Sequence, residues 1–157
     1  MLKLPPLLHI GQVVYDARTA VKDLQDRYGL EEIRPAIELT LDNQVDGSEH
    51  GVFSARYHFL GLGNTELEII EPVGSAPSPY TQFLEECGEG LHHLAFNVDS
   101  IEEHLAAAPS AQLLVDAPMP YDSRMAYAKG LAPGALLELI EVPGGFAAAA
   151  DRYSQDG

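Results

Sequence analysis

The stretch HHLAFNV, residues 92–98, alternates polar with apolar side chains after its first histidine, as a half-buried strand does. Near the N-terminus, the stretch HIGQVV, residues 9–14, has a similar pattern and also begins with a histidine. Aligning the two stretches pairs His9 with His93 rather than with His92. The match predicts that the chain contains two copies of one unit, each of which begins with a strand that carries a histidine.

The segments that follow these two strands repeat in the same order, a helix and then three strands. The first helix is expected over residues 16–30, with Asp16 as its N-cap and Gly29 as its stop. The second helix is expected to start near Ser100, which has the spacing of a capping box with Glu103. The strands expected after the helices are 31–41, 52–63, 65–73, 111–121, 124–132 and 135–143.

The length of 157 residues suits one domain, 1–157, which we divide at the repeat. The expected parts are a first βαβββ module (7–73), a connector with a short helix (74–90), a second βαβββ module (91–143) and a tail (144–157). This order predicts an α+β fold in which both modules form one curved mixed sheet, with the helices outside. The single cysteine, Cys87, excludes an internal disulfide framework.

The chain is strongly acidic, with a formal net charge of −15 from 24 acidic residues against 9 lysines and arginines. We therefore expect no nucleic acid and no membrane surface as a partner, because both are bound through clusters of basic residues. No apolar run is long enough to span a bilayer, and the N-terminal residues lack the pattern of a signal peptide. A cytoplasmic location is the resulting expectation.

In each module the first expected strand carries a histidine and the last expected strand carries a glutamate. The stretches LEIIEP (67–72) and LELIEVP (137–143) align Glu68 with Glu138, and strand alternation places both on the concave face that the histidines share. Two carboxylates buried alone would be costly, whereas two carboxylates and two imidazoles suit Zn²⁺, Co²⁺, Ni²⁺, Mn²⁺ or Fe²⁺. The residues that would surround such a cation are His9, Glu68, His93 and Glu138.

Several neighbouring polar residues are expected to have other roles. Glu71 and Glu141 fall on the opposite face of their strands and are expected to be solvated strand ends. His92 is expected to face solvent or to support the ligands from outside the ligand set. Surface or packing roles are expected for His50, His58 and His104.

The paired stretches HIGQVV…LEIIEP and HHLAFNV…LELIEVP resemble those of the vicinal oxygen chelate superfamily, which includes glyoxalase I, extradiol dioxygenases and methylmalonyl-CoA epimerase. The resemblance covers residues 7–143. The Gly-Asn-Thr turn at 63–65, the Ser-Pro pair at 78–79 and the Gly-x-His-His motif at 90–93 are similar to the epimerase-like branch. By this resemblance, the ligands of one divalent metal ion are His9, Glu68, His93 and Glu138, and some members of the branch have glutamine at the position of Glu68.

The resemblance also implies two opposed glutamates that act as acid and base. One is Glu138, which would be both a metal ligand and a proton carrier, and the other is Glu49, within the segment EHGV at 49–52. Its neighbours Asp46 and His50 are the alternatives for the second role. One carboxylate would remove an α-proton while the metal stabilises the enolate, and the other would return the proton on the opposite face, which inverts the α-carbon.

The resemblance therefore implies a metal-dependent epimerase or isomerase that acts on a small-molecule carbonyl substrate, with an acyl-CoA such as methylmalonyl-CoA as one candidate. Arg56, Arg124 and Lys129 are the cations expected to be available for the phosphates of CoA. A homodimer is expected from the same resemblance.

Two other functions remain open at this point. A lyase of the glyoxalase I type, acting on a glutathione hemithioacetal, would share the same ligand set. A non-catalytic protein that binds an aromatic compound would need no metal, so the four intact ligand residues argue against it. Ring-cleaving dioxygenases use one carboxylate with two histidines, whereas this chain offers two carboxylates.

Overall fold

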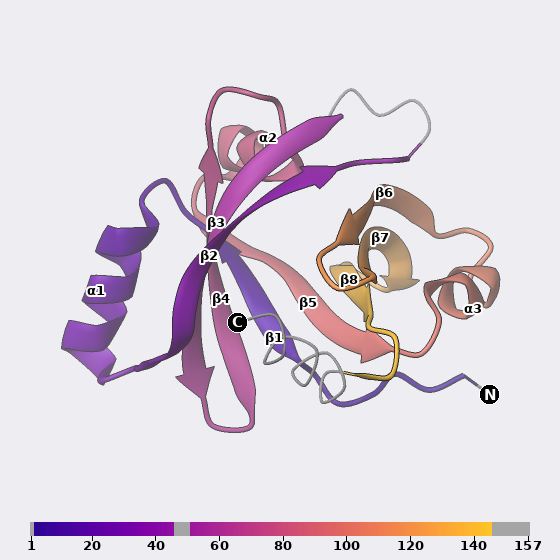
Figure 1. Cartoon of the computed structure of the whole chain (residues 1–157), viewed down its shortest axis with the longest axis horizontal. Helices are drawn as coiled ribbons and strands as arrows, with labels where there is room; N and C mark the ends of the chain where they lie inside the picture. The colour runs from indigo at the N-terminus through magenta and orange to yellow at the C-terminus, as the bar shows by residue number, and fades with distance from the viewer. Residues whose placement is uncertain (1, 46–50, 146–157) are drawn as a thin grey trace.

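The strands in the described part of the chain form one mixed sheet in the order β2-β3-β4-β1-β5-β8-β7-β6 (Figure 1). The computed structural model describes residues 2–45 and 51–145. Its strands are β1 (His9–Val13), β2 (Glu32–Asp42), β3 (Val52–Leu62), β4 (Thr65–Val73), β5 (Gly90–Val98), β6 (Gln112–Met119), β7 (Ser123–Ala132) and β8 (Ala135–Glu141). Its helices are α1 (Ala17–Tyr28), α2 (Pro79–Cys87) and α3 (Ile101–Ala106).

The two halves of the sheet have the same internal arrangement. β1 pairs in parallel with β4, β5 pairs in parallel with β8, and the other neighbours within each half are antiparallel. β1 and β5 pair antiparallel with each other and join the halves at the centre. The prediction of two βαβββ modules in one curved mixed sheet is confirmed, and α1 and α3 lie at opposite ends of the molecule (Figure 1).

The helices α1 and α3 begin at the caps that the sequence predicts. The side chain of Asp16 accepts a hydrogen bond from Thr19 N at 2.9 Å, and Gly29 ends α1 with a φ of 65°. Ser100 Oγ accepts from Glu103 N at 3.3 Å at the start of α3. These contacts satisfy backbone N–H groups that have no partner within the helix. No helix in the described part of the chain is long and apolar enough to cross a membrane.

Apolar side chains form separate cores on the two faces of the sheet. The largest core lies inside the curve and includes aromatic residues from β3, β7 and α2. Two smaller cores lie on the other face, where α1 packs on the first half of the sheet and α3 packs on the second. The helices α1 and α3 therefore cover the outer face, whereas α2 contributes to the inner core, and the inner face of the central strands is left for polar residues that lie among aromatic ones.

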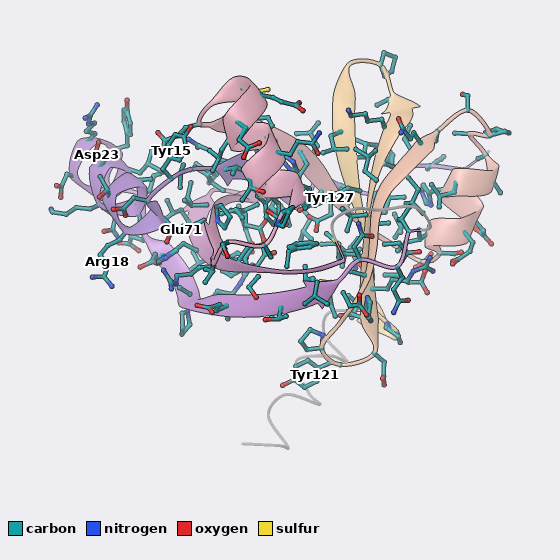
Figure 2. All side chains as sticks on the ribbon, turned by 90° about the horizontal axis from the view of Figure 1, so that it is seen from above. Tyr15, Arg18, Asp23, Glu71, Tyr121 and Tyr127 are labelled. Atoms are coloured by element: carbon teal, nitrogen blue, oxygen red, sulfur yellow. The ribbon has the colours of Figure 1, made fainter. Side chains whose placement is uncertain are left out.

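Glu71 and Glu141 cap the two outer helices, so the prediction that they are solvated strand ends is wrong. Glu71 Oε2 accepts a hydrogen bond from Ala17 N at 2.8 Å, and Glu141 Oε2 accepts one from Ile101 N at 3.0 Å. Each carboxylate meets the first N–H groups of its helix, where the helix dipole favours negative charge. Figure 2 shows Glu71 beside α1. Both residues do lie on the face opposite the predicted ligands, as the alternation of the strand predicts.

The outer edges of the two halves meet at one end of the sheet, where the segment after β2 reaches β6. The buried side chain of Asn43 donates to Leu114 O at 3.2 Å and accepts from Asp116 N at 3.1 Å. Gln44 N adds a hydrogen bond to Asp116 O at 2.8 Å. These bonds tie the first edge strand to the last and hold the curve of the sheet at this end.

Candidate metal centre

Four buried side chains from the four central strands converge on the inner face of the sheet. β1 supplies His9, β4 supplies Glu68, β5 supplies His93 and β8 supplies Glu138, and each is less than a tenth exposed. One nitrogen or oxygen atom from each lies within 4.8 Å of the others. The structure thus brings together the four residues that the sequence singles out as ligands, from positions far apart in the chain.

The imidazoles and carboxylates of this cluster point at one another through the same few atoms. Glu138 Oε2 lies 2.9 Å from His9 Nε2 and 3.0 Å from His93 Nε2. Glu68 Oε2 lies 3.2 Å from His9 Nε2 and 3.5 Å from His93 Nε2. The two Nε2 atoms are themselves 3.1 Å apart. Two nitrogens and two oxygens therefore surround one small volume.

The hydrogen bonds within the cluster do not satisfy all of its atoms, which is the observation that fits a cation. Glu68 Oε2 is buried and makes no hydrogen bond, even though His9 Nε2 is only 3.2 Å away. The facing Nε2 atoms also cannot both donate to each other. A cation that accepts a lone pair from each of these atoms would satisfy all four, and two imidazoles with two carboxylates are a ligand set that divalent transition metals use.

The electrostatics of the cluster couple its imidazoles to its carboxylates. Burial opposes a charge on His9, but the nearby carboxylates of Glu68 and Glu138 outweigh it and raise the pKa of His9 to about 10. Burial likewise opposes a charge on His93, but the carboxylate of Glu138 outweighs this effect and raises the pKa of His93. Burial alone would raise the pKa of both glutamates, but the nearby imidazoles outweigh it and lower both values. The two negative charges thus require two positive charges, which a divalent cation would supply without protons.

A glycine and a β-bulge position the ring of His93. Gly11 faces His93 across β1 and β5, and a Cβ on Gly11 would lie 2.0 Å from His93 Cε1. In the next step of the register Gln12 faces Leu91, so His92 is an extra residue in β5. Such a bulge redirects side chains that would otherwise alternate between the two faces of a strand. The sequence signal for this geometry is the glycine at position 11, which our sequence analysis did not use.

His92 lies against the ligand cluster from outside, which is the second of the two roles expected for it. Its Nδ1 is 3.0 Å from Nδ1 of His93, and its ring contacts Tyr80, Phe83 and Tyr127. Burial among these rings lowers the pKa of His92 to about 3. Its side chain is not among the four that converge, and it is only partly exposed.

Three tyrosines beside the cluster were not anticipated from the sequence. Their hydroxyl groups form a chain in which Tyr57 and Tyr80 are 3.2 Å apart and Tyr80 and Tyr127 are 2.7 Å apart. Burial raises the pKa of each of them, so all three remain neutral hydrogen-bonding groups. Figure 2 shows Tyr127 in the interior, close to α2. Strand alternation places Tyr57 and Tyr127 on the inner face, and only the fold brings Tyr80 of α2 between them.

The other residues singled out from the sequence lie elsewhere. Glu49, Asp46 and His50 fall outside the described residues. Arg56 forms ion pairs with Glu38 and Glu71 at 3.2 and 3.3 Å. The structure thus engages Arg56 with carboxylates on the outer face of the sheet.

The other two cations expected from the sequence, Arg124 and Lys129, have different surroundings. Arg124 is held by Asp116 through two hydrogen bonds of 2.7 and 2.8 Å and also pairs with Glu102, whereas Lys129 is exposed on the same strand.

Arg34 was not singled out from the sequence. Its guanidinium lies 3.8 Å over the ring of Phe59, which faces Glu68 in the neighbouring strand. Arg34 also forms two hydrogen bonds to Glu66, of 2.8 and 2.5 Å.

Comparison with known proteins identifies relatives of one family. The family model described as the glyoxalase/bleomycin resistance protein/dioxygenase superfamily matches residues 8–125. Methylmalonyl-CoA epimerase of Mus musculus is 34% identical over 100 residues, which are 63% of this chain and 49% of that protein. Ethylmalonyl-CoA/methylmalonyl-CoA epimerase of Cereibacter sphaeroides is 30% identical over 96 residues, which are 60% of this chain and 62% of that protein. The chain thus spans about half to three fifths of these curated relatives.

A solved structure supports the fold independently. A variant of Streptomyces coelicolor methylmalonyl-CoA epimerase, in complex with 2-nitronate-propionyl-CoA, superposes with a TM-score of 0.64 at 22% identity. The superposition covers 89% of this chain and 96% of that chain. At this identity the match shows that the two proteins share the fold.

Proposed function

Because the chain belongs to the glyoxalase/bleomycin resistance protein/dioxygenase superfamily, we propose that it is a metal-dependent epimerase that inverts the carbon α to the carbonyl of an acyl-CoA. The observation that carries the proposal is the buried cluster of two imidazoles and two carboxylates on the inner face of the sheet. The names of the relatives from Mus musculus and Cereibacter sphaeroides support the choice of reaction.

The four converging residues are the proposed metal ligands. Their Nε2 and Oε2 atoms already point into one small volume, and burial keeps competing water away from it. A divalent cation there would supply Lewis-acid stabilisation for the negative charge that develops on a carbonyl oxygen when the α-proton leaves. The candidates remain Zn²⁺, Co²⁺, Ni²⁺, Mn²⁺ and Fe²⁺, which elemental analysis of the purified protein distinguishes. The proposed ligands are His9, Glu68, His93 and Glu138.

Glu138 is the first proposed proton carrier. In the described part of the chain, its hydrogen bonds and ion pairs with the two histidines are made by Oε2. Its Oε1 is therefore the oxygen that we assign to proton transfer. A glutamate side chain is ionised at neutral pH, so this carboxylate can accept a proton from the substrate.

Glu49 is the proposed second proton carrier, because inversion requires that the proton returns to the face opposite the one it left. It lies outside the described residues, and the proposal rests on its match to the EHGV segment of the epimerase-like branch. The chain on either side of it is held by a hydrogen bond from Asn43 N to Gly51 O of 2.8 Å.

The proposed substrate is an acyl-CoA of the methylmalonyl type. The related solved structure binds 2-nitronate-propionyl-CoA, and both curated relatives are named for malonyl-CoA derivatives. Since Arg56, Arg124 and Arg34 are engaged with carboxylates, the exposed Lys129 is the cation that we assign to anionic parts of the substrate. A homodimer is part of this proposal, and the sedimentation mass of the protein tests it.

Proton exchange in D₂O tests the proposed reaction directly. Metal-loaded protein is incubated with one epimer of methylmalonyl-CoA, and NMR follows α-deuteration while chiral analysis follows inversion. We expect both, and we expect Glu138→Gln to abolish both. Glu85→Gln is the matched control, because Glu85 is exposed on α2 away from the cluster. If methylglyoxal with glutathione is converted while no acyl-CoA exchanges its α-proton, the lyase is the correct function and the epimerase proposal fails.

The role of Glu49 has its own test in the same assay. Glu49→Gln should bind metal normally and lose inversion, because one of the two opposed carriers is gone. Exchange on a single face would survive, since Glu138 is intact. Inversion at the wild-type rate in Glu49→Gln would remove Glu49 from the mechanism and leave Asp46 and His50 as the residues to substitute next.

A further inference from the structure

The β-bulge in β5 turns two consecutive histidines to the same side of the sheet. His92 is the extra residue of the bulge, since Gly11 faces His93 and the next residue of β1 faces Leu91. Both rings reach the inner face, where each contacts the ring of Tyr127. The first-half counterpart of His92 is Leu8, so this histidine is not a feature that the two modules share.

The two rings meet through one defined pair of atoms. Nδ1 of His92 lies 3.0 Å from Nδ1 of His93, which is a hydrogen-bond distance. The other nitrogen of His93, Nε2, is the one directed at Glu138 and Glu68. A hydrogen bond at Nδ1 therefore acts on the ring edge that faces away from the cluster.

The direction of this hydrogen bond follows from the state that a metal ligand requires. An imidazole that binds a metal through Nε2 carries its proton on Nδ1, and a doubly protonated imidazole carries one there as well. In both states Nδ1 of His93 donates, so Nδ1 of His92 must be the bare acceptor. A residue in this position selects the tautomer of the ligand and the angle of its ring.

His92 is itself held in place by aromatic rings. Its ring centroid lies 5.4 Å from that of Tyr80, 5.1 Å from Phe83 and 5.3 Å from Tyr127. The first two belong to α2, the helix of the connector between the modules. Edge-on packing on several sides leaves the ring of His92 little freedom to rotate, so its acceptor stays directed at His93.

We propose that His92 is a positioning residue of the metal centre, whose bare Nδ1 accepts the Nδ1–H of His93 and so keeps Nε2 of His93 bare and directed at the metal. The inference rests on the proposed function, because it presupposes that His93 is a ligand. It assigns α2 a role as well, since the helix supplies two of the rings that hold His92.

NMR of the wild-type protein loaded with Zn²⁺ tests the hydrogen bond itself. With ¹⁵N-labelled histidine, we expect a slowly exchanging proton on Nδ1 of His93 and a scalar coupling across the hydrogen bond to Nδ1 of His92. A proton on Nδ1 of His92, or a bare Nδ1 on His93, would overturn the proposal. This measurement needs no substitution, so it stands even if a variant fails to fold.

Two substitutions at position 92 separate the acceptor from the ring. His92→Phe keeps an aromatic ring without an acceptor, whereas His92→Asn loses the ring but places an amide oxygen close to where Nδ1 lies. We expect His92→Phe to weaken Zn²⁺ binding about 10–100-fold, measured by competition with a chromogenic chelator, and His92→Asn to recover most of the affinity. His58→Phe is the matched control, because His58 pairs with Glu32 away from the cluster.

The outcomes distinguish this inference from the proposed function. Wild-type protein that binds no divalent metal contradicts the metal centre and, with it, the role of His92. Wild-type protein that binds Zn²⁺ while His92→Phe binds it equally well contradicts only the role of His92. Zn²⁺ binding that is weakened equally by His92→Phe and His92→Asn also overturns the role, because the ring and not the acceptor would then be what matters.

Discussion

His93 reaches the cluster because the residue that faces it, Gly11, has no side chain. The ring of His93 occupies the space where a Cβ of Gly11 would be, at 2.0 Å from Cε1. Its second support is the contact with His92 described above. This proposed ligand therefore depends on two neighbours that would touch neither metal nor substrate, as is common in metal centres.

Substitution of Gly11 by alanine should displace the ring of His93. The Cβ cannot fit without movement of the ring or of β1, so Nε2 of His93 would leave the cluster. We expect Zn²⁺ affinity to fall by about tenfold or more in calorimetric titration. Gly51→Ala is the matched control, because a Cβ there meets no atom of the described residues within 4 Å. Unchanged affinity in Gly11→Ala would show that His93 is not a ligand.

The pKa values of the cluster predict how the stability of chelator-treated protein depends on pH. The raised pKa of His9 means that its contribution to stability is present below pH 6.5 and is lost as the pH rises towards about 10. The lowered pKa values of Glu68 and Glu138 mean that their contribution is present above pH 4.5 and is lost as the pH falls. Urea denaturation should therefore show the highest free energy of unfolding between about pH 4.5 and pH 6.5.

Loading with Zn²⁺ supplies the control for this pH dependence. Metal binding requires deprotonated imidazoles, so its stabilisation should increase from pH 6.5 towards about 10, the range in which the metal-free protein loses the contribution of His9. Parallel pH profiles for the loaded and the metal-free protein would contradict the placement of His9 in the metal site.

At the scale of elements, the two modules repeat their helix caps as well as their ligands. Glu71 lies three residues after Glu68, Glu141 lies three residues after Glu138, and each caps the helix of its own module. An odd spacing along a strand places the ligand on one face and the cap on the other. A single strand thus contributes to the inner site and to the outer helix at once.

Removal of one such cap should lower stability and leave the site intact. Glu141→Ala should reduce the free energy of unfolding by about 0.5–2 kcal/mol, because the N–H of Ile101 loses its acceptor. Urea denaturation measures the loss, and Zn²⁺ affinity should stay unchanged since the side chain faces the outer helix. Glu85→Ala is the control at an exposed position. A large loss of Zn²⁺ affinity in Glu141→Ala would mean that the two faces are not independent.

At the scale of the whole molecule, the two modules are joined at the centre of the sheet and again at its edges. β1 pairs with β5 at the centre, while Asn43 ties the end of β2 to β6. Half of the proposed ligand set comes from each module, so the site exists only while the modules keep their relative position. The bonds of Asn43 therefore support the site from a distance.

Loss of the Asn43 side chain should loosen the closure between the edges. Asn43→Ala leaves Leu114 O and Asp116 N without their partner, and we expect a loss of about 1–3 kcal/mol in the free energy of unfolding. Amide exchange at Asp116 should speed up more than exchange in β1. Thr40→Ala is the control, because Thr40 bonds only Ser54 on an exposed surface in the described contacts. Unchanged exchange at Asp116 would contradict the closure.

Much of this architecture was predictable from short-range patterns. Alternation in HIGQVV and HHLAFNV indicated the two central strands, and Asp16 and Ser100 marked the helix starts. The half-to-half alignment selected His93 over His92 as the residue that joins the cluster, and the structure brings that residue to His9. These features depend on residues that are close in sequence, or on a repeat that can be read directly.

The sequence by itself therefore determined the two modules, their order of elements and the four residues that converge. Only the tertiary structure decided that Glu71 and Glu141 cap helices, that a bulge turns His92 inward, and that Tyr80 links tyrosines of both modules. The physical reason is register. Side-chain alternation is a local property of one strand, whereas the pairing of strands, the position of a bulge and the docking of α2 depend on contacts between segments that are distant in the chain.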